Sequence, residues 1–172
     1  WAYIGDSCTV LLECKSLRPS IELTTYGSDR SLVDLNERVA AAVEQLIKHS
    51  EGISDGKWEQ AGLRSALTVG VIVTYGKFFS INGPFSRRRI REAISDKKLA
   101  TIPFVVLSLD ELDTVVRLVE TGHSFDLLIQ SLASDESSFD PLHKHHEELR
   151  ERSVSSFTYS RGVEFMGRVV RP

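Results

Sequence analysis

Residues 67–75 read LTVGVIVTY, a nearly continuous run of apolar and β-branched side chains. Such a run predicts a central strand that is buried on both faces, because a strand with one wet face alternates between apolar and polar residues. Farther along the chain, Ile102 to Leu107 predicts a second buried strand. Between the two strands, residues 86–94 follow the turn sequence Asn82-Gly83-Pro84 and predict a short basic helix.

The N-terminal side of this run adds a hairpin and a helix. Two β-prone segments, 1–4 and 9–15, flank Gly5-Asp6-Ser7, which has the composition of a turn. Apolar residues then recur at helical spacing and predict a helix over 34–48, followed by a loop over 50–62 that is rich in Gly, Ser and Asp. We expect the strand at 9–15 to lie beside the strand at 67–75. The helix is expected to pack on this sheet through Val39, Val43 and Leu46.

The C-terminal side carries helix signals. Ser108 and Glu111 have the spacing of a capping box, and Gly122 is a natural stop for the helix that follows. Ser124 can cap a further helix, whereas residues 134–152 are polar and residues 163–170 predict a closing strand. This order of strands and helices predicts an α/β fold in which helices flank a mixed β-sheet.

The composition places limits on the class of protein. A chain of 172 residues is expected to form a single domain, and its longest apolar runs are far too short to cross a bilayer. The two cysteines and the absence of a secretion signal favour a cytoplasmic protein without disulfides. Since the chain begins at Trp1 and its one methionine is Met166, we expect a fragment of a longer multidomain protein. With a net charge of -3, any attraction to nucleic acid must come from local basic clusters.

Three places in the chain have an acid, any residue and then lysine, and the first of them lies on a strand. Period-two alternation puts Glu13 and Lys15 of Glu13-Cys14-Lys15 on one face of the strand at 9–15. A carboxylate can bind a hard cation such as Mg²⁺, and a neighbouring lysine can assist an attacking water and offset negative charge. The other two matches, Asp55-Gly56-Lys57 and Asp96-Lys97-Lys98, follow no apolar strand.

An apolar strand ending in Glu13-Cys14-Lys15-Ser16, followed by a loop and an amphipathic helix with Glu44-Gln45-Leu46, resembles the PD-(D/E)xK nuclease superfamily. The resemblance covers roughly the first half of the chain. It implies a restriction-endonuclease-like core and a Mg²⁺-dependent nuclease, with Mn²⁺ as a possible substitute. It further implies that Glu13 and the backbone carbonyl of Cys14 bind the metal and that Lys15 is catalytic.

The family's second metal acid has two candidate positions. Asp6 stands seven residues before Glu13, whereas the family's usual aspartate would lie just before Trp1, because it belongs to the strand that starts there. Both positions stay open at this stage. Gln45 resembles a helix glutamine of RecB-like members that points toward the site, although His49 stands where those members have tyrosine.

Other polar and aromatic clusters have weaker signals. The arginine cluster, Arg87, Arg88, Arg89 and Arg91, can contact phosphates, and its alternative interpretation is a solvated helix face. Histidines 143, 145 and 146, with two glutamates after them, lack a spaced partner pair for zinc, so we expect a solvated segment. Aromatic residues near the buried strands are expected to belong to the core.

Two functions remain open from the sequence. The first is a metal-dependent nuclease domain that hydrolyses phosphodiester bonds, with DNA as the expected substrate and with targeting supplied by other domains of the parent protein. The second is a catalytically inactive module of the same fold that binds nucleic acid or a protein partner. A clear aspartate on the first strand would separate them, and residues 1–4 contain none.

Overall fold

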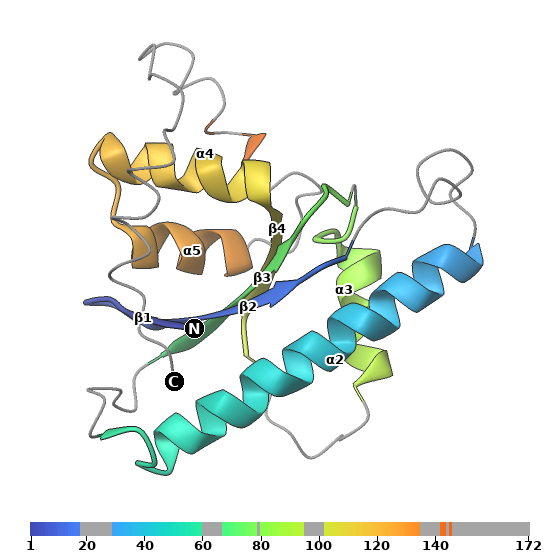
Figure 1. Ribbon diagram of the computed structural model, residues 1–172, viewed down its shortest axis with the longest axis horizontal. Coiled ribbons are helices and arrows are strands. Elements are labelled where there is room, and N and C mark those ends of the chain that lie inside the picture. Colours follow the sequence, from blue (N-terminus) through green and yellow to red (C-terminus); the bar gives the residue numbers. More distant parts are fainter. Residues whose placement is uncertain are drawn as a thin grey trace.

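A four-stranded mixed sheet forms the centre of the computed structural model (Figure 1). The structure describes residues 1–17, 29–59, 67–78, 80–94, 102–134, 142, 143 and 145. Within this part of the chain, β1 runs antiparallel to β2, whereas β2, β3 and β4 run parallel, in the order β1-β2-β3-β4. The strands are β1 (Ala2–Ile4), β2 (Thr9–Lys15), β3 (Thr68–Thr74) and β4 (Phe104–Ser108). The predicted mixed sheet is therefore confirmed.

The register of the strands brings their polar ends together. Lys15 pairs with Thr74 across β2 and β3, and Thr74 pairs with Ser108 across β3 and β4. These three residues are the last of their strands, so the carboxyl ends of the parallel strands meet at one edge of the sheet. The hairpin pairs Ala2 with Leu11, which places the start of β1 beside the middle of β2.

Two pairs of helices cover the two faces of the sheet (Figure 1). The helices α2 (Asp29–Ser54) and α3 (Pro84–Ala93) pack on one face, where Val39, Val43 and Leu46 join the core as expected. The helices α4 (Leu109–Glu120) and α5 (Phe125–Ser134) pack on the other face. Each face thus has its own buried cluster, and the expected α/β arrangement is confirmed.

The helix α2 is longer than its predicted range of 34–48, and the expected loop at 50–62 is wrong at its start. Ile53 is 2% exposed and belongs to the core, so burial continues the helix through the polar stretch. Gly52 is tolerated there because the indole of Trp58 packs against it. A Cβ at position 52 would lie 3.0 Å from the Trp58 Nε1 atom.

The start and the stop of α4 agree with the sequence signals. The Ser108 side chain accepts a hydrogen bond from the Glu111 backbone N–H, and the Glu111 carboxylate accepts one from Ser108 N–H, which completes the capping box. Gly122 follows α4 with a φ of +105°, a conformation that favours glycine. The predicted strand at 163–170 and most of the polar stretch at 134–152 lie outside the described residues. None of the helices in the described ranges is both long and apolar enough to span a membrane.

Candidate active site

Glu13 and Lys15 point from the end of β2 toward the face that α2 covers. Glu13 pairs with Ile72, and Ile72 belongs to the core beneath α2. Paired residues of neighbouring strands share a face, and alternate residues of one strand do so too. Glu13 and Lys15 therefore share one face, as predicted. The buried apolar residues of β2 precede them along the strand, and the polar residues stand at its carboxyl end.

A lysine lies between a carboxylate and an amide in this cluster. The Lys15 Nζ atom is 2.7 Å from the Glu13 Oε1 atom, and it donates a hydrogen bond of 2.8 Å to the Gln45 Oε1 atom from α2. The Glu13 and Lys15 side chains are 27% and 29% exposed. The ammonium group is thus fixed by two oxygen atoms while both charged groups stay accessible to a ligand.

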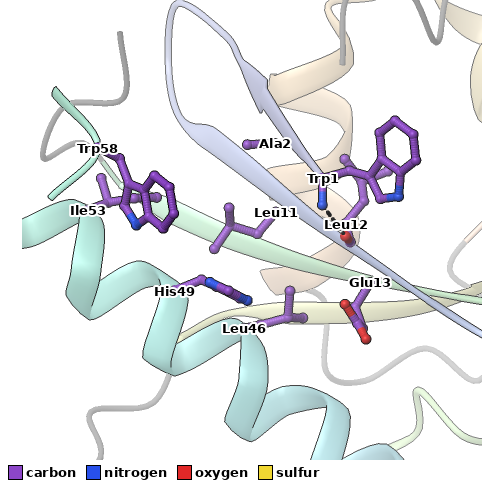
Figure 2. Close-up of a pocket in the computed structure, with 9 residues that line it drawn as sticks. All are labelled: Trp1, Ala2, Leu11, Leu12, Glu13, Leu46, His49, Ile53 and Trp58. Atoms are coloured by element: carbon purple, nitrogen blue, oxygen red, sulfur yellow. Dashed lines mark hydrogen bonds between the residues drawn. The ribbon is translucent and has the colours of Figure 1, made fainter. Parts of the chain in front are cut away.

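A small pocket that is open to solvent lies next to Glu13 between β2 and α2 (Figure 2). Figure 2 shows the His49 ring extending from α2 toward the strand, with Leu46 between His49 and Glu13. The other wall residues are mainly apolar. The full lining is Trp1, Ala2, Leu11, Leu12, Glu13, Leu46, His49, Ile53 and Trp58.

Asp6 does not join this cluster. It is exposed in the turn between β1 and β2, whereas Glu13 is near the opposite end of β2. Seven strand positions at about 3.3 Å each separate them by roughly 20 Å. A metal ion bound to oxygen atoms at about 2.0–2.6 Å cannot span that distance, so Asp6 and Glu13 cannot share one.

The hairpin register shows where a second acid would have to lie. Trp1 and Leu12 exchange both backbone hydrogen bonds, at 3.0 Å and 2.8 Å. If this ladder continues by one residue, the position before Trp1 pairs with Glu13. An acid at that position would share the face of Glu13, and the second of the two alternatives stays a prediction.

The described residues offer a hard cation one carboxylate and one backbone carbonyl in this cluster. Ladder alternation directs the Cys14 carbonyl to the β1 side of β2, beyond the Trp1–Leu12 pair. The Cys14 thiol is a poor ligand, because partial burial and the charge of Glu13 raise its pKa. Among the residues that the structure describes, no three His, Cys, Asp or Glu side chains form a metal-binding group. Mg²⁺ often binds through one or two carboxylates, water and substrate phosphates, so Glu13 and Cys14 fit a partial site.

The arginine cluster divides into a buried and an exposed part. Arg87 is 1% exposed, and its guanidinium donates hydrogen bonds of 2.8 Å to the carbonyls of Asn82 and Ala133. It is therefore not available to bind phosphates, contrary to the sequence expectation. Arg88, Arg89 and Arg91 lie at or near the surface of α3.

Two pocket residues were not singled out by the sequence as site residues. His49 lies one turn after Gln45 on α2, at the i, i+4 spacing that puts two side chains on one helix face. This spacing was a usable signal. Trp58 reaches the pocket only because it packs against Gly52, and no sequence pattern predicts that contact.

No protein-family model matches the chain, and no curated protein matches it in sequence. Among solved structures, it has a distant similarity to the small subunit of a heterodimeric restriction endonuclease, with a TM-score of 0.34 and 12% sequence identity. The match covers 87% of this chain and 65% of that subunit, so the chain spans less than two thirds of the subunit's length. The candidate site rests on its own geometry.

Proposed function

We propose that this chain is a metal-dependent nuclease domain that hydrolyses phosphodiester bonds in DNA. The observation that carries the proposal is the cluster of Glu13, Lys15 and Gln45 at the polar end of β2. Each residue comes from a rigid element, so their mutual positions are set by the sheet and by α2. DNA as the substrate rests on the resemblance to the PD-(D/E)xK superfamily.

Each residue of the cluster has a separate role in this proposal. Glu13 and the Cys14 carbonyl would hold Mg²⁺ or Mn²⁺, which lowers the pKa of water and offsets charge on the phosphate when bound. Lys15 hydrogen-bonds the attacking water and stabilises negative charge on the phosphate. Gln45 holds the Lys15 ammonium in place and is a positioning residue.

A catalytically inactive module is the second candidate. One observation favours it: within the described part of the chain, Glu13 is the one carboxylate of the cluster. Such a module would bind nucleic acid or a protein partner without turnover. The ion pair of Glu13 and Lys15 would then contribute about 0–1 kcal/mol of stability and no activity.

Cleavage by the full-length protein tests the proposal. Glu13→Ala and Lys15→Ala should each lower Mg²⁺-dependent DNA cleavage by about 10²- to 10³-fold, because the first removes a ligand of the metal and the second removes a positive charge beside the phosphate. Gln45→Ala should lower it by about 10-fold, since Lys15 keeps only one of its two partners. Asp6→Ala is the matched control, because this exposed acid lies at the other end of β2.

Metal binding separates the roles of the two charged residues. Glu13→Ala should weaken Mn²⁺ binding, measured by calorimetry, whereas Lys15→Ala should largely spare it, since lysine is no ligand for hard cations. Equal cleavage by the wild type and both variants would show that the site is elsewhere. A folded wild type that neither cleaves DNA nor binds Mn²⁺ would support the inactive module.

A further inference from the structure

The exposed side of α3 carries a phenylalanine next to two arginines. Phe85, Arg88 and Arg89 follow the spacing i, i+3, i+4, so they lie together on one side of the helix. We call these three residues the aromatic–arginine stripe. The opposite side of α3 is buried and comprises Ser86, Arg87 and Ile90.

The ring of the stripe is accessible and in contact with both cations. Phe85 is 51% exposed. The guanidinium carbon of Arg89 lies 4.6 Å from the ring centroid, and that of Arg88 lies 5.7 Å from it. Such contacts restrict the arginine side chains to positions beside the ring before a ligand binds. Binding then costs less side-chain entropy.

The charge of the stripe is positive although the chain as a whole is negative. The helix α3 has four arginines and one acid, Glu92, whereas the net charge of the chain is -3. The Arg88 Nε atom lies 3.8 Å from the Glu92 Oε1 atom, and both side chains are more than 60% exposed. An exposed ion pair is weak, so a phosphate can compete with Glu92 for Arg88.

The stripe belongs to the side of the molecule that carries the candidate site. The helix α3 packs against α2, which provides Gln45, and the two helices cover the same face of the sheet (Figure 1). The chain enters α3 shortly after β3, whose last residue, Thr74, pairs with Lys15. A strand of nucleic acid that reaches Lys15 therefore has α3 nearby.

We propose that the aromatic–arginine stripe binds an unpaired segment of nucleic acid. One base stacks on Phe85, and the flanking phosphates bind Arg88 and Arg89. An exposed phenyl ring beside two cations fits this ligand, because a single strand offers both free base faces and closely spaced phosphates. In a duplex the base faces are already stacked, so Phe85 would gain nothing there. The proposal rests on the proposed function and narrows its substrate to DNA with a single-stranded part.

Equilibrium binding without metal tests the proposal separately from cleavage. The full-length protein is titrated in EDTA against a labelled single-stranded DNA oligonucleotide and against the blunt duplex of the same sequence. Phe85→Ala should weaken single-strand binding by about 5- to 150-fold, the range expected for one stacked base, and leave duplex binding unchanged. Phe85→Trp should restore the affinity. Leu127→Ala is the matched control, because Leu127 is 56% exposed on α5, at the other face of the sheet.

The salt dependence identifies the role of the arginines. Replacing Arg88 and Arg89 with alanine should lower the slope of log K against log salt by about 0.7 for each lost phosphate contact on a single strand. Phe85→Ala should leave this slope unchanged. An unaltered single-strand affinity in Phe85→Ala, an equal loss for the duplex, or no oligonucleotide binding by the wild type would each overturn the proposal. Because the assay contains no metal, its result stands whatever Glu13→Ala does to cleavage.

Discussion

Arg87 shows at the scale of a single residue why a run of identical side chains is ambiguous. Three consecutive arginines on a helix point in directions about 100° apart, so one of them can face the core while the others face solvent. Its guanidinium also lies 5.3 Å from the centroid of the Phe104 ring. The sequence alone predicted a basic surface. It did not show which arginine would be buried and hydrogen-bonded to the Ala133 carbonyl at the end of α5.

Arg87→Ala should destabilise the fold by about 2–4 kcal/mol, because it leaves the carbonyls of Asn82 and Ala133 buried without these donors. Arg88→Ala, at an exposed position of the same helix, should change stability by no more than about 0.5 kcal/mol. Urea denaturation of the two variants measures the difference. Equal midpoints would mean that water replaces the guanidinium.

The placement of the candidate site was largely predictable at this scale. Period-two alternation was enough to put Glu13 and Lys15 on one face, and their contact at 2.7 Å agrees with it. Gln45 meets Lys15, as the resemblance to a nuclease family implied, although its role stays a prediction. Asp6 does not reach the cluster, because a strand is extended and residues far apart along it are also far apart in space. A residue in the turn before β2 therefore cannot approach the far end of that strand.

At the scale of elements, strands were easier to predict than the length of helices. The apolar runs gave β3 and β4 nearly to the residue, because a buried strand has to be apolar throughout. The end of α2 was missed because its last turns have a polar composition, and the burial of Ile53 that supports them is a tertiary effect. Polar composition identifies loops only where no distant segment covers them.

Among the described residues, a side chain and not a strand pairs with the outer edge of β4. The Asn82 side chain donates a hydrogen bond of 2.7 Å to the Val106 carbonyl and accepts one of 2.9 Å from Val106 N–H. It thus imitates one residue of a strand and satisfies a part of the edge that could otherwise pair with another chain. Asn82 is 3% exposed, so water has little access to these groups.

Asn82→Ala should therefore lower the free energy of unfolding by about 2–4 kcal/mol, since two backbone groups of Val106 lose their partner. It should also speed hydrogen exchange at the Val106 amide more than at Val71 in the centre of the sheet, as long as the variant stays folded. Exchange followed by NMR measures both sites in one sample. A Val106 amide that remains as well protected as in the wild type would contradict this role for Asn82.

At the scale of the whole molecule, Asp126 joins the turn between β1 and β2 to α5. Its carboxylate accepts hydrogen bonds of 2.7 Å from the backbone N–H and the hydroxyl of Ser7, and another from the Ser124 hydroxyl. Gly5 allows this approach, since a Cβ there would lie 2.5 Å from Asp126 side-chain atoms. The contact joins positions 119 residues apart and closes the sheet against α5 at the end opposite to the candidate site.

This contact should make the stability of the fold sensitive to acid. Burial raises the pKa of the Asp126 carboxyl, but the hydrogen bonds from Ser124, Ser7 and Leu127 outweigh it and hold the pKa well below its usual value. The unfolded chain, with an aspartate pKa of about 3.9, then binds a proton more readily than the folded protein does. The stabilising contribution is therefore complete above about pH 5 and is lost as the pH falls through the pKa of the unfolded chain toward that of the folded protein.

Urea midpoints between about pH 6 and pH 2.5 should decline less steeply for Asp126→Asn than for the wild type, from a lower starting stability. Asp6 is an exposed acid in the turn between β1 and β2, next to Ser7, and Asp6→Asn should follow the wild-type curve. If Asp126→Asn and the wild type lose stability in parallel, the acid sensitivity of this fold comes from other carboxylates.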